Sequence, residues 1–221
     1  MGTLQNTEIY KFVKEGKALN SLLFKILYPF VWLFMKIFYP FEIIGEEKLA
    51  KQDKIIIYAN HISFLDPINL IILAHRNKKV LNFMAKDELF KNALFSWFLK
   101  KMGAFSVKRG DGAASLKKAA DILEEGKTFC IFPEGTRSKN GQLGRPKSGI
   151  SFLMCEMGVP AQPVAIVTKG QKMKAFQKTK IVVCDRITLD GQTIEMSDRR
   201  ALRDLSAKLF EPIAQAIEQN K

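Results

Sequence analysis

The sequence has few residues of the kinds that build disulfide frameworks and metal sites. It contains three cysteines and two histidines in 221 residues, and the cysteines never occur as a Cys-x-x-Cys pair. Cys130, Cys155 and Cys184 lie far apart, each inside an apolar run, which is typical of small buried side chains in a reducing compartment. We therefore expect neither a disulfide framework nor a zinc site, and no other bound metal.

Acidic residues are also scarce. The 22 Asp and Glu residues are outnumbered by 35 Lys and Arg residues, which gives a formal net charge of +13. Such a charge predicts an anionic partner. A nucleic-acid partner would require basic residues among exposed aromatics or a known recognition fold, and the lysines here are instead spread along the chain. We expect a negatively charged membrane surface and anionic substrates, and no nucleic acid.

Long hydrophobic runs are missing as well. In the apolar segment 19–44 the longest stretch without charge is Ile26 to Met35, about half of what a membrane-spanning helix needs. No small-residue cleavage site follows it, which argues against a secretory signal.

Three lysines in the N-terminal region follow a helical spacing. Lys14, Lys25 and Lys36 recur every eleven residues, just over three helical turns, so they align on one helical face. A basic stripe on an apolar, aromatic-rich helix is typical of helices that lie in the membrane interface. Residues 1–44 are therefore predicted to form membrane-anchoring helices with a bend at Pro29. A helix packed on the protein's own core is the alternative.

The remainder of the chain, residues 45–221, is predicted to form one α/β domain. Apolar, β-branched runs predict strands at 41–44, 55–59, 81–85, 105–107, 128–132, 164–167 and 180–187. Between them, amphipathic patterns predict helices that begin at 66, 87, 113, 149 and 197. This alternation indicates a mixed, mainly parallel sheet flanked by helices. The apolar face at 89–98 either lines a slot for an acyl chain or belongs to the core.

The stretch Asn60-His61-Ile62-Ser63-Phe64-Leu65-Asp66 follows the strand predicted at 55–59. His61 thus lies between the carboxyl end of a strand and a helix, where open α/β sheets bind ligands. Asp66 is predicted as the N-cap of that helix, with Pro67 at its first position. A carboxylate on one ring nitrogen would leave the other nitrogen as a general base. A single histidine beside a strand is more often packed or solvated than catalytic.

A second stretch, Phe132-Pro133-Glu134-Gly135-Thr136-Arg137-Ser138, follows the strand predicted at 128–132. Its residues offer a charge, backbone N–H groups and a bidentate phosphate ligand. The alternative is a tight turn with an internal ion pair between Glu134 and Arg137.

Together these stretches resemble the glycerophospholipid acyltransferase family, specifically the bacterial 1-acylglycerol-3-phosphate acyltransferases. Two further motifs of that family follow in order, Gly103 to Arg109, with its Phe one position early, and Val159 to Ile166. The resemblance spans residues 60 to 166 and implies the acyltransferase fold, with both main motifs at one end of the sheet.

The resemblance also implies roles for individual residues. His61 would take the proton from the acceptor hydroxyl while Asp66 holds the imidazole, so that no Ser or Cys nucleophile is required. Backbone N–H groups near Gly135 would meet the oxyanion, and Glu134 would position Arg137 or contact the glycerol. Substrate binding would involve Lys86, Arg109, Glu134, Gly135, Thr136, Arg137 and Lys147.

The activity implied is transfer of a fatty acyl group from acyl-CoA or an acyl carrier protein to the sn-2 hydroxyl of lysophosphatidic acid. No resident cofactor would be needed, and the enzyme would lie on the cytoplasmic face of the inner membrane, bound to anionic phospholipid. Two alternatives stay open. One is a related acyltransferase that uses glycerol 3-phosphate or another lyso-lipid, and the other is a lipid-binding surface protein with a decayed site.

Overall fold

The structure, a computed structural model, describes residues 22–108, 110–189, 191 and 194–221. The strands are β1 (Phe41–Ile44), β2 (Ile56–Ala59), β3 (Leu81–Lys86), β4 (Ala104–Val107), β5 (Thr128–Ile131), β6 (Ala161–Thr168) and β7 (Thr179–Val183). The α-helices are α2 (Leu22–Phe38), α3 (Asp66–Arg76), α4 (Ala93–Lys101), α5 (Gly112–Glu124), α6 (Gly149–Met157) and α7 (Arg199–Gln219). Short 3₁₀ helices are η1 (Glu46–Lys48), η2 (Asp87–Phe90) and η3 (Lys169–Gln171).

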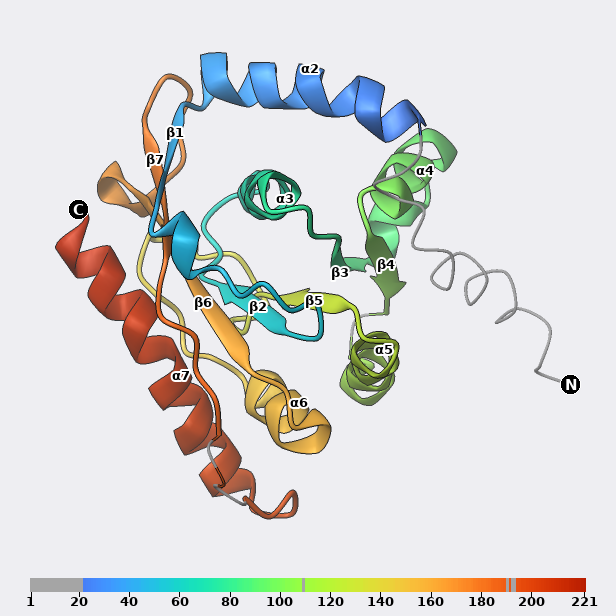
Figure 1. Cartoon of the computed structure of the whole chain (residues 1–221), viewed down its shortest axis with the longest axis vertical. Helices are drawn as coiled ribbons and strands as arrows, with labels where there is room; N and C mark the ends of the chain where they lie inside the picture. Colours follow the sequence, from blue (N-terminus) through green and yellow to red (C-terminus); the bar gives the residue numbers. More distant parts are fainter. Residues whose placement is uncertain (1–21, 109, 190, 192–193) are drawn as a thin grey trace, which may run out of the picture.

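All these strands form one sheet in the order β1-β7-β6-β2-β5-β3-β4 (Figure 1). Neighbouring strands are parallel except for β6 and β7, which are antiparallel. Every residue of β2, β5 and β6 is buried, as expected for central strands covered on both faces. The predicted mixed, mainly parallel α/β fold is confirmed.

Helices cover both faces of the sheet (Figure 1). On one face α3 packs against the strands and α2 lies across α3, and on the other lie α5, α6 and α7. Alternation along the strands separates the two cores, since Ile57 and Cys130 belong to the first and Tyr58 and Phe129 to the second.

One face of α2 is buried and the other is exposed. Met35 is fully buried, and the Tyr28 ring lies 3.8 Å from the ring of His75 on α3, centroid to centroid. The apolar side chains on the outer face are exposed: Ile26, Phe30, Leu33, Phe34, Ile37 and Phe38. The helix continues through Pro29. None of the described helices is both long enough and apolar enough to cross a membrane.

Of the three lysines predicted to align on one helical face, the structure describes the side chain of one. Lys36 is exposed, over the rings of Trp32 and Phe41. Lys14 and the side chain of Lys25 lie outside the described residues. β1 falls within the predicted N-terminal segment 1–44 and is nevertheless part of the sheet.

Two predicted helix starts differ from the structure. Asp66 is the first residue of α3 and not its N-cap, because its carboxylate accepts hydrogen bonds from the preceding loop. Asp87 begins η2, and α4 starts only at Ala93. The carboxylate of Asp87 accepts a hydrogen bond from the Ser106 hydroxyl on β4.

The apolar face predicted at 89–98, which either lines a slot for an acyl chain or belongs to the core, is only partly packed. An apolar crevice between α2, α3 and α4 is lined by residues that include Val31, Ile72 and Phe98. Its cavity of about 10 Å³ has room for no more than about one water molecule. Of the predicted apolar face, Phe98 lines this crevice, whereas Leu89, Leu94 and Trp97 are exposed.

Candidate active site

The two main motifs meet at the carboxyl edge of the central strands. β2 and β5 pair in parallel, with Tyr58 opposite Ile131, so the loops that follow them leave the sheet on the same side. The backbone N–H of Ser138 donates to the carbonyl of His61, over 2.8 Å. This confirms the expected convergence, at the place where α/β sheets bind ligands.

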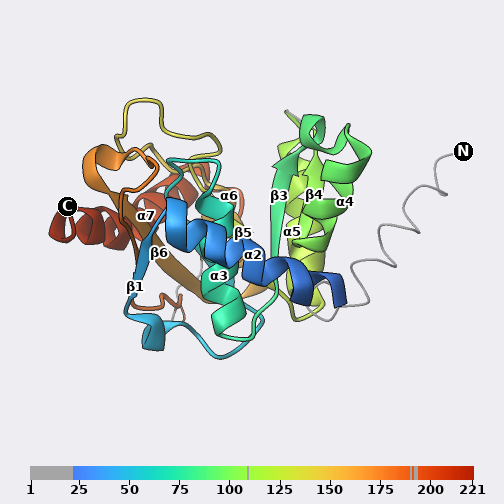
Figure 2. The same cartoon turned by 90° about the horizontal axis from the view of Figure 1, so that it is seen from above.

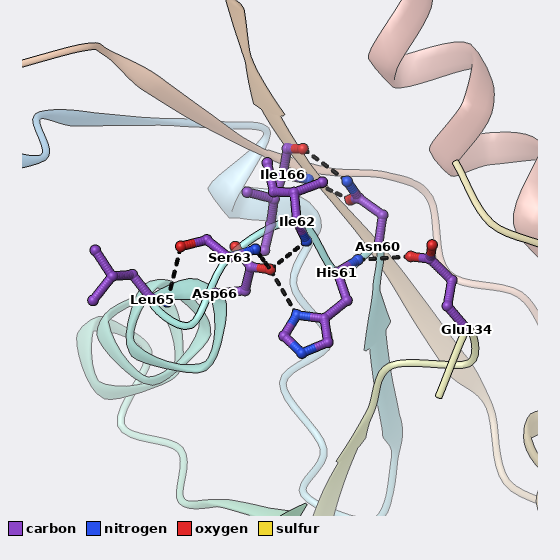
Figure 3. Close-up of polar contacts among 8 residues, drawn as sticks. All are labelled: Asn60, His61, Ile62, Ser63, Leu65, Asp66, Glu134 and Ile166. Carbon is purple, nitrogen blue, oxygen red and sulfur yellow. Dashed lines mark hydrogen bonds and ion pairs between the residues drawn. The ribbon is translucent and has the colours of Figure 1, made fainter. Parts of the chain in front are cut away.

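His61 and Asp66 form a hydrogen-bonded pair at this edge (Figure 3). The imidazole Nδ1 lies 2.8 Å from Asp66 Oδ2, and the side chains are 18% and 0% exposed. The same oxygen accepts hydrogen bonds from the backbone N–H groups of Ile62 and Ser63, at 2.6 and 2.7 Å. Because Oδ2 acts as an acceptor, the hydrogen of the neutral ring belongs on Nδ1, which leaves the lone pair of Nε2 for a substrate proton.

Asn60 anchors the start of this loop to the sheet. Its Oδ1 accepts from the Ile166 N–H at 2.7 Å, and its Nδ2 donates to the Ile166 carbonyl at 2.9 Å. The side chain thereby continues the pairing of β2 with β6 by one residue beyond the strand. The sequence alone predicts no role for Asn60, because its partner lies 106 residues away along the chain.

Glu134 supports His61 from the opposite side (Figure 3). The carboxylate is buried and accepts hydrogen bonds from the backbone N–H groups of His61, at 2.7 Å, and Gly144, at 2.8 Å. Burial raises the pKa of Glu134, against the smaller lowering effect of these two N–H groups. In the described part of the chain Glu134 forms no ion pair with Arg137. The alternative interpretation, a tight turn with an internal Glu134–Arg137 pair, is therefore wrong.

Arg137 lies on an aromatic ring of the other motif. Its guanidinium carbon is 3.3 Å from the ring centroid of Phe64, which is 68% exposed. This cation–π contact holds the guanidinium at the mouth of the site, where its N–H groups face solvent. Phe64 was not predicted as a site residue. An aromatic residue in a polar loop, where it has no core to join, is the signal that points to it.

Gly135 and Lys147 are brought together at the turn. Gly135 has φ of 70°, a left-handed conformation that favours glycine. Lys147 Nζ lies beside it, 2.8 Å from the position that a Cβ would take. The N–H of Gly135 already donates to the Phe132 carbonyl at 2.9 Å. Within the described part of the chain no hydrogen bond engages the N–H groups of Thr136 and Arg137.

The other predicted phosphate ligands lie further along the same edge. Lys86 ends β3 and is exposed, but β5 separates that strand from β2. Arg109 lies outside the described residues, two positions after the end of β4. Their contact with a substrate stays a prediction.

The cysteines and the second histidine are remote from this chemistry. Burial raises the pKa of Cys130 to about 12 and that of Cys184 to about 11, so both are protonated thiols at neutral pH. His75 packs under α2, where burial lowers its pKa. The only imidazole among the described residues at the carboxyl edge of the sheet is that of His61.

A cavity of about 300 Å³ lies beside Glu134. It is bounded by Asn60 and Ile62, by the loop 141–143 and by the C-terminal end of α7. The His61 side chain does not line this cavity. The cavity therefore adjoins Glu134, which supports the histidine, and not the imidazole itself.

The site lies inside a stretch that matches a known family. Residues 40–167, more than half of the chain, match the sequence profile of the family described as Acyltransferase. The chain belongs to this family. Two relatives illustrate how similar this acyltransferase is in sequence to other proteins.

A probable 1-acyl-sn-glycerol-3-phosphate acyltransferase from Mycoplasma pneumoniae is 33% identical over 189 residues, which cover 82% of this chain and 70% of the relative. A chloroplastic 1-acyl-sn-glycerol-3-phosphate acyltransferase from Brassica napus is 34% identical over 140 residues, or 62% of this chain. Those residues cover 40% of the Brassica protein, so the acyltransferase matches less than half the length of that relative.

The crystal structure of the 1-acyl-sn-glycerophosphate acyltransferase PlsC from Thermotoga maritima has the same fold. It superimposes with a TM-score of 0.67 at 22% sequence identity, and the match covers 96% of this acyltransferase and 90% of PlsC. At that identity the likeness concerns the fold.

Proposed function

We propose that this acyltransferase transfers a fatty acyl group from an acyl thioester to the sn-2 hydroxyl of 1-acyl-sn-glycerol 3-phosphate, which gives phosphatidic acid. The observation that carries the proposal is the His61–Asp66 pair at the carboxyl edge of the central strands, with Nδ1 2.8 Å from Oδ2. The names of the relatives from Mycoplasma and Brassica support the choice of acceptor.

The chemistry needs a base, an oxyanion donor and alignment of two substrates. His61 Nε2 takes the proton of the acceptor hydroxyl as its oxygen attacks the thioester carbon, and Asp66 stabilises the imidazolium that forms. The tetrahedral oxyanion accepts hydrogen bonds from the backbone N–H groups of Thr136 and Arg137, which are not engaged elsewhere in the described chain. Collapse of this intermediate breaks the C–S bond, and the imidazolium returns its proton to the departing thiolate.

Recognition of the acceptor phosphate falls to the basic residues along the carboxyl edge. Arg137, held over Phe64, provides a planar fork that suits a phosphate. Lys147 adds an amine beside Gly135, and Lys86 and Arg109 extend the positive edge away from the histidine. The reaction itself requires no resident cofactor, because the acyl thioester, acyl-CoA or an acyl carrier protein, is already activated.

The lipid acceptor places the enzyme at a membrane surface. The exposed apolar face of α2 suits insertion into one leaflet, and the excess of Lys and Arg suits anionic phospholipid. These properties support attachment to the cytoplasmic face of the inner membrane.

The test is to incubate the purified chain with lysophosphatidic acid, glycerol 3-phosphate and a second lyso-lipid, each with acyl-CoA and with an acyl carrier protein. We expect phosphatidic acid from lysophosphatidic acid, and at least about a hundredfold slower formation by the matched His61→Ala variant. Product from another acceptor alone would identify the related acyltransferase instead. Binding of lipid without turnover by any donor would identify a lipid-binding protein with an inactive site.

A further inference from the structure

The hairpin between β6 and β7 is a basic segment that the proposed reaction does not use. Residues 169–178 contain Lys169, Lys172, Lys174 and Lys178 and no acidic residue. Lys178 pairs with Glu42 at 2.7 Å. The other three lysines are exposed and form no ion pair with any described residue. The hairpin therefore presents uncompensated positive charge.

Phe176, near the end of this hairpin, is held outward by the backbone. It is 72% exposed and has φ of 60°, a left-handed conformation that is costly for a bulky side chain. Its N–H donates to the Phe38 carbonyl at 2.6 Å, and its ring centroid lies 5.6 Å from that of Phe38. A strained, exposed aromatic residue fixed in this way is better explained by a contact outside the domain than by folding.

The hairpin and α2 form one surface. Both views show the hairpin beside the C-terminal end of α2 (Figures 1 and 2). The ring of Phe34 lies 5.0 Å from that of Phe38, so exposed aromatic rings run without interruption from α2 to Phe176. We call Phe34, Phe38 and Phe176, together with Lys169, Lys172 and Lys174, the hairpin patch.

The hairpin patch is also on the active-site side of the sheet. β6 pairs in parallel with β2, with Val164 opposite Ala59, so the hairpin that follows β6 leaves the sheet at the same edge as His61. A single interfacial helix leaves the domain free to rotate about the helix axis. A second contact at this edge would prevent that rotation and keep the active site facing the surface that α2 is proposed to bind.

We propose that the hairpin patch binds an anionic lipid surface, and that residues 169–178 thereby add a second contact, separate in sequence from the N-terminal helix, at the point where they meet Phe34 and Phe38 of α2. The inference rests on the proposed action at a membrane. Lysines attract anionic headgroups, and the exposed rings, continuous with the apolar face of α2, enter the interface. An acidic protein partner would need the lysines but would not need Phe176 in line with an apolar helix face.

The experiment measures sedimentation of the full chain with vesicles of phosphatidylcholine, with or without phosphatidylglycerol. The charge variant combines Lys169→Gln, Lys172→Gln and Lys174→Gln. The aromatic variant is Phe176→Asn, since Asn tolerates the left-handed conformation and the hairpin keeps its fold. The matched control combines Lys117→Gln, Arg203→Gln and Lys208→Gln, all exposed on α5 and α7 at the opposite face of the sheet.

We expect the charge variant to lose about fivefold in affinity for anionic vesicles per lysine, about a hundredfold in total at low salt. Its affinity for neutral vesicles should be unchanged, and the loss should shrink at high salt. Phe176→Asn should lose about tenfold on both kinds of vesicle. The control should lose less than the charge variant.

Wild-type affinity in both hairpin variants would overturn the proposal. So would unchanged vesicle binding combined with a selective loss of the acyl carrier protein as donor, which would identify the patch as a protein-docking surface. The binding measurement needs no turnover, so it gives a result even if the proposed acyl transfer is wrong.

Discussion

The imidazole of His61 is bound to Asp66 at one nitrogen, and its backbone is bound to Glu134 and Ser138. The ring also stacks on Phe132, with centroids 4.2 Å apart. The side chain is thus positioned by two loops at once. A base held in this way loses little entropy when the acceptor hydroxyl approaches.

Removal of the base should abolish most of the activity. We expect His61→Ala to lower kcat by about 10²–10⁴-fold, the contribution typical of a general base. Asp66→Asn should be nearly as severe, because an amide can support the wrong ring tautomer and no longer presents a carboxylate to Ile62 and Ser63. Turnover and cooperative thermal unfolding, measured together, check both variants. A folded His61→Ala variant with more than half of the wild-type activity would contradict the assignment.

Glu134 should give the protein an identifiable pH dependence of stability. Because burial raises the pKa of its carboxyl in the folded state, its stabilising contribution is complete below the unfolded pKa of about 4.3. That contribution is lost as the pH rises through the higher folded-state pKa. We expect Glu134→Gln to remove this loss. The free energy of unfolding of wild type, compared with the variant, should fall as the pH is raised above about 4.3. A difference that is constant over this range would contradict it.

Arg137 should discriminate between the two substrates. Arg137→Lys keeps the charge but loses the planar fork and the stacking on Phe64. We therefore expect a rise in the KM for the phosphate-bearing acceptor of about tenfold, equivalent to about 1.4 kcal/mol, from the loss of a bidentate contact. The KM for the acyl donor should change little. Steady-state kinetics with each substrate varied in turn measures both, and the opposite pattern would place the arginine in the donor site.

At the scale of elements, α2 has two separable roles. Its inner face closes the core through Met35, while its outer face presents apolar side chains to the surroundings. Deletion of the whole helix would expose the core and remove the proposed membrane contact at once. Single substitutions on each face can separate these effects.

Substitutions on the two faces of α2 should have opposite consequences. Phe30→Ser with Leu33→Ser should reduce binding to neutral and anionic vesicles alike, because burial of exposed apolar area drives it at roughly 25 cal/mol per Å². The free energy of unfolding should stay nearly constant. Met35→Ala should instead cost about 2–4 kcal/mol of stability without direct effect on binding. Vesicle sedimentation and denaturant unfolding distinguish the two. Full binding by the outer-face variant would exclude α2 as an anchor.

For the molecule as a whole, the proposed membrane attachment is from one side only. α2 and the hairpin patch lie on one side of the molecule, and α7 packs on the opposite face of the sheet (Figures 1 and 2). The outward face of α7 carries charged residues that include Arg203, Asp204 and Lys208, as expected for a surface in water.

Attachment from one side predicts where the chain termini lie. On sealed vesicles, cysteine labels or protease tags at residue 1 and residue 221 should be accessible from the same side. The physical reason is that the charge-free run from Ile26 to Met35 is about half of a membrane span. Termini on opposite sides would mean that the segment crosses the bilayer.

Local sequence patterns were enough to predict the class of fold and the contact between His61 and Asp66. Alternating β-branched and amphipathic runs are local patterns, and they predicted the strands and most helix starts to within a few residues, whereas α4 starts at Ala93 and not at the predicted Asp87. His61 and Asp66 are only five residues apart, so one loop decides their contact. The spacing within this motif is therefore sufficient to predict the contact between the two side chains.

The contacts that support His61 and Asp66 could not be predicted from local patterns, because they depend on the tertiary fold. Glu134 might equally have paired with Arg137, and only the alignment of β2 with β5 brings it to the His61 N–H, 73 residues away. Three other contacts likewise join segments that no local pattern relates. They are the contacts of Phe64 with Arg137, of Asn60 with Ile166, and of Phe176 with Phe38. Such contacts depend on which strands are neighbours, and strand order is set by burial of the whole sheet and not by any one segment.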